Sequence, residues 1–152
     1  MVIGIHALDE VVAANPRAQI YIHELDFAFL RDPRLNYSDI NGFSLMVDTK
    51  PQTFTEGTYT IGGYTFEIIH TPGHTCGSSI FYFEEENVLF GDDTIMAELV
   101  GSARHPTGNE NDRENTIKMF KQMKFSDDMK VFGGHGKNTI YKNLMKTNVD
   151  LQ

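Results

Sequence analysis

The middle of the chain decides the fold: residues 58–83 read TYTIGGYTFEIIHTPGHTCGSSIFYF. Two runs rich in β-branched and aromatic residues, 58–61 and 64–69, flank Gly62-Gly63, and this pattern is typical of a β-hairpin. The runs 79–83 and 88–90 flank an acidic turn and predict a second hairpin. The two predicted hairpins are joined by a polar, glycine-rich turn.

Helical patterns on both sides of this β-rich region predict a mixed domain. Leu8, Val11 and Val12 share one helical face, and Asn15-Pro16 ends that helix because proline disfavours the α conformation in the residue before it. No internal repeat or linker interrupts the chain. We therefore expect one α/β or α+β domain over residues 1–152. Its further elements are expected to be a strand at 18–22, a helical turn or two at 23–30, helices at 111–124 and 138–146, and a strand at 130–132.

Composition excludes several classes of protein. A content of 40% hydrophobic and 22% charged residues is that of a soluble globular domain, and 152 residues suffice to bury a core. The formal net charge of -8 argues against a non-specific nucleic-acid or anionic-membrane binder. No apolar run approaches the roughly 20 residues that span a bilayer, and the N-terminus lacks signal-peptide features. The single cysteine excludes an intramolecular disulfide, so we expect a cytoplasmic protein.

Three glycine-rich turns follow predicted strands and carry side chains that bind metals. They contain His74, the pair Asp92-Asp93, and His135. Imidazole and carboxylate suit zinc, iron or manganese, and catalytic metal sites are built where such groups converge from separate loops. Each residue alone is better explained as a cap or turn residue than as a ligand, but the three together predict a metal site.

The motifs around these residues resemble a known family. Thr71-Pro72-Gly73-His74-Thr75 with Gly77-Ser78 resembles the central motif of the metallo-β-lactamase superfamily, and Phe90-Gly91-Asp92 resembles its bridging-aspartate strand. Gly134-His135-Gly136 is similar to the late histidine turn of the glyoxalase II-like (hydroxyacylglutathione hydrolase-like) branch. Arg104 and Gly108-Asn109 stand in the intervening loop as they do in that branch.

The resemblance implies an incomplete fold. The His-x-His-x-Asp-His signature of the superfamily is absent from this sequence, while residues 2–5 and the helix after them resemble the segment that follows the signature. We therefore expect a single, N-terminally incomplete domain over residues 1–152, equivalent mainly to the second half of the αββα sandwich.

The resemblance also implies a metal site with defined roles. His74 would be the third histidine of the first metal position, Asp92 would bridge two metals, and His135 would complete the second position. Neighbouring residues of a strand point to opposite faces, so only one of Asp92 and Asp93 is expected to face the cleft, and the family match favours Asp92. Zinc, or alternatively iron or manganese, would be bound as one or two ions and would generate hydroxide from water.

Other candidate residues are interpreted as structural. His70 is expected in the core or behind the metal ligands, and His6 and His23 lie at predicted helical positions. His105 is interpreted as a loop residue, with lining of the substrate side as the alternative. Cys76 is interpreted as a small buried residue rather than a ligand.

The function that the resemblance implies is metal-dependent hydrolysis of a small ester or thioester, with thioesters favoured. Because the signature is absent, we expect weak metal affinity and little or no hydrolysis by this chain alone. The alternatives are a non-catalytic metal-binding or oligomerisation module, and, less favoured, redox or nuclease chemistry on the same fold. Faces that absent strands would cover predict a homo-oligomer. No nucleic acid and no membrane is expected as a partner.

Overall fold

A computed structural model describes residues 7–152. The chain divides into two compact units, with the boundary between Phe54 and Thr55. Each unit is described by itself. The expectations for His6 and for residues 2–5 lie outside the described residues. Within residues 7–152, no helix combines the length and the apolar character needed to cross a membrane.

The first unit is built from short elements. Helix α2 (Leu8–Ala14) ends at Asn15, in agreement with the predicted stop before proline. Strand β1 (Tyr21–His23) pairs in parallel with β2 (Gln52–Phe54), and the 3₁₀ helices η1 (Glu24–Leu30) and η2 (Asp39–Asn41) lie between them along the chain.

Hydrogen-bonded polar side chains hold this first unit together. His23 is 6% exposed, and its Nδ1 accepts the backbone N–H of Leu25, so it caps η1 and is structural, as predicted. Asn36 is fully buried, and its amide donates to the carbonyl oxygens of Phe29 and Leu45. The Asp9 carboxylate accepts hydrogen bonds from the segment just before β2.

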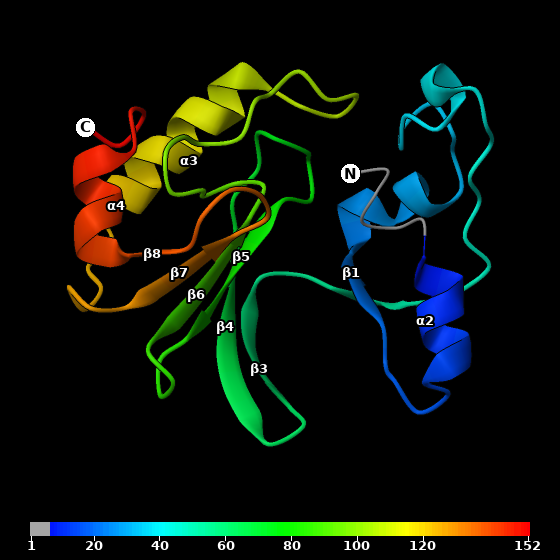
Figure 1. Cartoon of the computed structure of the whole chain (residues 1–152), viewed down its shortest axis with the longest axis horizontal. Helices are drawn as coiled ribbons and strands as arrows, with labels where there is room; N and C mark the ends of the chain where they lie inside the picture. Colours follow the sequence, from blue (N-terminus) through cyan, green and yellow to red (C-terminus); the bar gives the residue numbers. More distant parts are fainter. Residues whose placement is uncertain (1–6) are drawn as a thin grey trace. The chain divides into compact units, whose positions relative to one another are not determined.

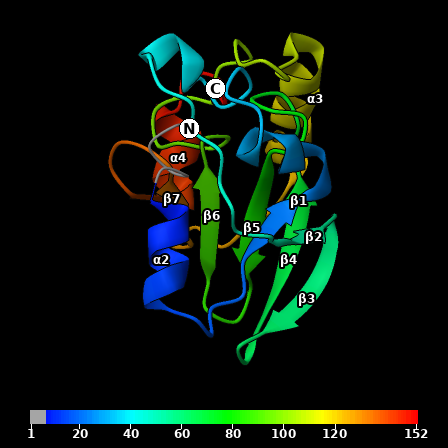
Figure 2. The ribbon, with the colours of Figure 1, turned by 90° about the vertical axis from the view of Figure 1, so that its right-hand side faces the viewer.

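The second unit is a six-stranded sheet with the order β3-β4-β5-β6-β7-β8 (Figures 1 and 2). All neighbours are antiparallel except β6 and β7, which are parallel and are connected through a helix. The strands are β3 (Gly57–Ile61), β4 (Tyr64–His70), β5 (Ser79–Phe83), β6 (Val88–Asp92), β7 (Lys130–Gly133) and β8 (Thr139–Ile140). The two hairpins predicted from the sequence are therefore confirmed.

One face of this sheet packs against the helices α3 (Glu110–Gln122) and α4 (Tyr141–Thr147), which lie on the same side of it in Figure 1. The core contains Ile80, Leu89 and Val131 from the strands and Phe120 and Leu144 from the helices, and each of these is at most 1% exposed. Alternation along the strands sends the neighbouring side chains to the opposite face.

That opposite face carries a row of aromatic rings. Phe66 and Phe83 stack with centroids 4.7 Å apart, Phe83 meets Phe90 edge-on at 5.6 Å, and Phe90 stacks on Phe132 at 5.4 Å. Phe90 is 44% exposed. We call Phe66, Phe83, Phe90 and Phe132 the aromatic face.

The differences from the predicted elements have local causes. The first strand covers Tyr21–His23 rather than 18–22, and the helical segment after it is 3₁₀ rather than α. The last helix begins at Tyr141, because Thr139 and Ile140 pair with β7 as β8. Strands of two or three residues such as β2 and β8 are defined by pairing with a neighbouring strand, so their own residues do little to predict them. The expectation of a single domain stays a prediction.

Candidate metal centre

The turn at residues 71–78, here called the middle turn, is closed by its own hydrogen bonds. The Thr71 N–H donates to the Ser78 carbonyl at 2.8 Å, and the Thr75 N–H donates to Ser78 Oγ at 2.9 Å. His70 Nε2 lies 2.8 Å from the carbonyl oxygen of Cys76, which accepts from it. His70 thus braces the turn from behind, consistent with its predicted structural role.

His74 projects from the middle turn with only 10% of its side chain exposed. Its Nδ1 lies 2.9 Å from the carbonyl oxygen of Ser102. A carbonyl only accepts, so Nδ1 carries the proton, and in the neutral form of the ring the lone pair is then on Nε2. This Nε2 is buried without a hydrogen-bond partner. An oriented imidazole with a free lone pair is the arrangement that metal-binding histidines adopt.

The side chain that lies between the two predicted imidazoles is Asp93. Its Oδ2 is 3.7 Å from His74 Nε2, and its Oδ1 is 3.2 Å from His135 Nε2. Oδ1 is nevertheless buried without a hydrogen bond, because the approach of His135 lacks hydrogen-bond geometry. The structure therefore brings His74 and His135, which lie 61 residues apart in the sequence, to one carboxylate.

Asp92, the predicted bridging residue, has a different setting. No ion pair joins it to either imidazole in the part of the chain that the structure describes. Its backbone has φ 45°, in the left-handed region, and the pairing of β6 with β7 shifts register between Phe90 and Asp92. Side chains need not alternate between the two faces of a sheet across such an irregularity. Alternation therefore could not tell which of Asp92 and Asp93 faces the imidazoles. Loss of solvation, and then the charge of Asp93, raise the pKa of Asp92.

Two glycines let the backbone approach these groups closely. A Cβ added at Gly134 would lie 2.4 Å from Asp93 Oδ1, and one added at Gly101 would lie 1.9 Å from the Asp93 carbonyl oxygen and 3.0 Å from His74 Nδ1. A side chain at Gly134 would displace the Asp93 carboxylate, and one at Gly101 would clash with the Asp93 backbone beside His74.

The loop 101–109 is fastened to the middle turn. The Asn109 N–H donates to the Gly73 carbonyl at 3.0 Å, and the Cys76 N–H donates to Thr107 Oγ1 at 3.1 Å. This loop supplies the Ser102 carbonyl, and it places the His105 ring 4.0 Å from that of His74. Desolvation, and then the charge of His74, lower the pKa of His105. The sequence interpretation of His105 as a loop residue holds, but its contact with His74 was not foreseen.

Arg113 supports the backbone next to Ser102, and sequence reasoning missed this role. Its Nε donates to the Gly101 carbonyl at 2.8 Å, and its Nη2 lies 2.7 Å from Asp150 Oδ1. The other oxygen of Asp150 accepts the Val100 N–H at 2.8 Å. Arg113 and Asp150 thus hold the residues just before Ser102, and the only signal in the sequence was a charged residue on a predicted helix.

The donors fit a metal in their chemistry but do not form a complete coordination sphere. In residues 7–152, no group of three or more His, Cys, Asp or Glu side chains is arranged to hold an ion. The half-buried Cys76 contributes its backbone to the turn, as a structural residue does. Two of the buried atoms without a hydrogen-bond partner, His74 Nε2 and Asp93 Oδ1, are ones that a metal would satisfy.

The sequence model of the metallo-β-lactamase superfamily matches residues 5–135. This chain belongs to the metallo-β-lactamase superfamily. It is 28% identical over 142 residues to a probable metallo-hydrolase of Streptococcus pyogenes, covering 89% of this chain and 60% of the relative. It is 31% identical over 88 residues to the hydroxyacylglutathione hydrolase GloC of Haemophilus influenzae, covering 58% of this chain and 41% of the relative.

A solved structure gives the same result for the fold. The crystal structure of the B3 metallo-β-lactamase BLEG-1 superposes with a TM-score of 0.86 at 29% identity, covering 97% of this chain and 71% of that chain. The chain spans less than two thirds of the length of the Streptococcus pyogenes and Haemophilus influenzae relatives. The predicted fold class, α/β of the metallo-β-lactamase type, is confirmed.

Proposed function

We propose that this chain carries the metal-binding part of a metal-dependent hydrolase that acts on a small ester or thioester. The observation that supports the proposal is the position of the Asp93 carboxylate between the Nε2 atoms of His74 and His135. Because the superfamily is established for this chain, the site and the fold point to the same chemistry.

His74, Asp93 and His135 are the residues proposed to hold the metal. When bound, zinc, iron or manganese lowers the pKa of a coordinated water and supplies hydroxide for attack on a carbonyl. The Ser102 carbonyl keeps the proton of His74 on Nδ1 and thereby leaves Nε2 for the ion. Asp93 takes the role that the sequence had given to Asp92, since its carboxylate lies near both imidazoles. One or two ions are proposed for the whole protein.

Thioesters are the favoured substrate class. The support is the similarity to the Haemophilus influenzae hydroxyacylglutathione hydrolase, together with the late histidine turn Gly134-His135-Gly136. Hydroxyacyl thioesters of glutathione are therefore the first compounds to test.

The test combines metal binding with turnover. The purified chain is titrated with zinc, iron(II) and manganese(II), and hydrolysis of a hydroxyacylglutathione is followed at saturating metal. We expect one ion bound weakly, a loss of binding in His74→Ala, and little or no turnover, because the sequence has no His-x-His-x-Asp-His segment. His23→Ala is the control, since His23 caps η1 in the first unit and takes no part in the proposed site. Zinc binding that is unchanged in His74→Ala would contradict the proposal.

A second candidate function is a non-catalytic assembly module. The observation that favours it is the aromatic face, where Phe90 remains 44% exposed and contiguous apolar surface favours association. A homo-oligomer through this face is expected to dissociate when Phe90 and Phe132 are replaced by Ser. Sedimentation of the unmodified chain as a monomer at micromolar concentration excludes this second function.

A further inference from the structure

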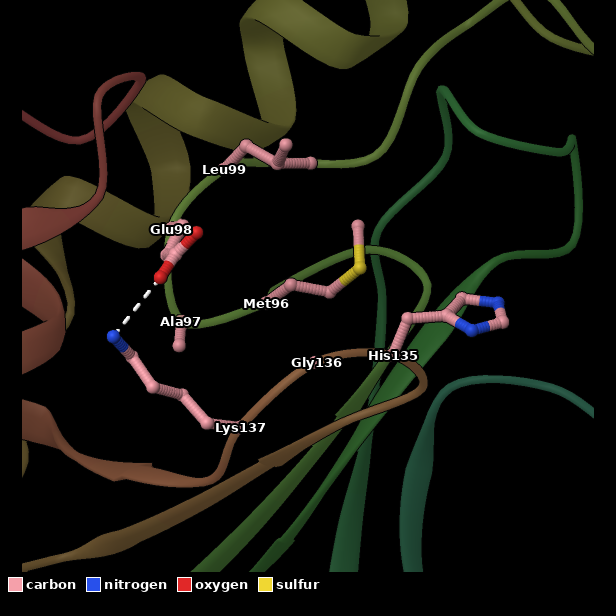
Figure 3. Close-up of a pocket in the computed structure, with 7 residues that line it drawn as sticks. All are labelled: Met96, Ala97, Glu98, Leu99, His135, Gly136 and Lys137. Carbon is pink, nitrogen blue, oxygen red and sulfur yellow. Dashed lines mark ion pairs between the residues drawn. The ribbon is translucent and has the colours of Figure 1, made fainter.

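A pocket of about 250 Å³ lies beside His135, between residues 96–99 and 135–137 (Figure 3). Its wall is apolar where Met96, Ala97 and Leu99 line it. Figure 3 shows the His135 imidazole at one end and the ion pair of Glu98 and Lys137 at the other. The pocket therefore begins at a proposed metal ligand and ends at a charged rim.

The wall of this pocket is held in place by its own hydrogen bonds. The Met96 N–H donates to the Leu99 carbonyl at 3.2 Å and closes the turn. The Met96 carbonyl accepts from the side chain of Asn148, which is fully buried, at 2.8 Å. Gly133 allows the end of β7 to approach this turn, since a Cβ there would lie 3.1 Å from Met96 Cα. These contacts give the pocket a fixed wall on this side.

We propose that the pocket is the acyl subsite of the hydrolase and takes a straight-chain acyl group of up to about six carbons. The inference rests on the proposed function, because it sets the carbonyl end of the substrate at His135. The size follows from the volume. A water occupies about 30 Å³ in the liquid, so 250 Å³ holds about eight groups of that size at most, which is enough for a six-carbon acyl group with its oxygen. The apolar wall favours hydrocarbon over a charged chain.

The ion pair at the rim sets the far limit of the pocket. Lys137 Nζ lies 2.9 Å from Glu98 Oε1, and both side chains are about 70% exposed. Exposed ion pairs contribute little stability, so Glu98 and Lys137 can separate to admit a longer acyl chain. Beyond this pair the acyl chain enters water and makes no further apolar contact. The two opposite charges leave no unpaired charge to attract an ionic acyl group.

The test uses the product acids as probes. The full chain, with and without zinc, is titrated with straight-chain carboxylates from acetate to octanoate while the methyl signal of Met96 is followed by NMR. We expect the affinity to rise about threefold to fourfold per methylene up to hexanoate and then to level off, with shifts at Met96. Leu99→Ala is expected to weaken hexanoate about threefold or more and to leave acetate unchanged. Tyr64→Ala is the control, since Tyr64 is also exposed and does not line the pocket.

The outcomes separate this inference from the proposed function. An affinity that is independent of chain length, or that rises equally in Leu99→Ala, overturns the acyl subsite even when zinc binding at His74 is intact. Length-dependent binding at Met96 in a chain that binds no metal supports the subsite and contradicts the hydrolase proposal. Leu99→Asp provides a second variant, and undiminished hexanoate binding in it also overturns the subsite.

Discussion

The two turns that carry the candidate imidazoles differ in how firmly they are built. In the middle turn, His74 is 10% exposed, its Nδ1 is bound by Ser102, and the backbone is closed by Ser78. In the turn at residues 133–137, here called the late turn, His135 is 69% exposed and glycines flank it. The comparison teaches that one half of the proposed site is preorganised and that the other is adaptable.

The difference has a consequence for metal affinity. Glycine on both sides of His135 gives this turn many backbone conformations, and fixing a residue costs about 1–2 kcal/mol. Binding an ion through His135 therefore includes the cost of ordering the late turn, whereas His74 is already oriented. This asymmetry agrees with the weak affinity expected from the sequence.

The largest effect is expected where both turns meet, at Asp93. Asp93→Asn removes the charge that lies near both imidazoles, and we expect the affinity for zinc to fall more than about 100-fold. Competition with a chromophoric chelator measures it. Asp92→Asn is the matched control and should change the affinity less than about threefold. The reverse order of the two variants would restore Asp92 as the ligand.

A smaller loss is expected when the late turn is pushed away from Asp93. Gly134→Ala puts a Cβ only 2.4 Å from Asp93 Oδ1, so the carboxylate must move, and we expect about a tenfold loss of zinc affinity. Gly62→Ala is the control, because that glycine has open space around it and lies in the β3–β4 hairpin turn. Its cost should appear in the free energy of unfolding alone. Equal zinc affinity in both variants would show that the late turn adapts without cost.

The third prediction compares the stability of the two turns directly. Ser78→Ala removes the oxygen that accepts the Thr75 N–H, and we expect the free energy of unfolding to fall by about 1 kcal/mol. Lys137→Ala in the late turn removes an exposed ion pair and should change it by less than about 0.5 kcal/mol. Urea denaturation measures both. A larger loss in Lys137→Ala would mean that the late turn is the more firmly built.

The smallest effect is expected in acid, at the support behind Ser102. Burial acts to raise the pKa of Asp150, but hydrogen bonds from Val100 and Arg113 outweigh it and leave that pKa below its ordinary value. A pKa lowered in the folded state means that the stabilisation is complete above about pH 3.9 and is lost as the pH falls toward the folded-state pKa.

Asp150→Asn removes this titration. Between pH 5 and pH 2, the free energy of unfolding of the variant should therefore decline less steeply than that of the unmodified chain, while the difference between the two should be constant above pH 5. Parallel curves over the acid range would contradict the assignment of the lowered pKa to Asp150.

Much of the fold was predictable because its signals are local. The β3–β4 hairpin follows from two β-rich runs around Gly62-Gly63, and the helix that ends at Asn15 follows from the proline after it. The parallel pairing of β1 with β2 had no such signal, because residues 21 and 52 meet only in the folded chain.

The candidate site shows the same division. The residue types and glycine-rich turns around His74 and His135 were sufficient to single out both histidines, and the tertiary structure brings both to one carboxylate. The choice between Asp92 and Asp93 depended on a backbone irregularity at the end of β6, which alternation cannot predict. The roles of Ser102 and Arg113 depended on hydrogen bonds to backbone carbonyls, which leave no trace in residue identity.

The sequence by itself determined the superfamily, the elements of the sheet and the chemical types of the proposed ligands, because these depend on motifs and on periodicity along the chain. Only the tertiary structure decided which carboxylate lies near the imidazoles, which ring nitrogen of His74 bonds to a carbonyl, and where an apolar pocket adjoins His135. Those properties depend on distances of a few ångströms between segments far apart in the sequence, and packing alone sets such distances.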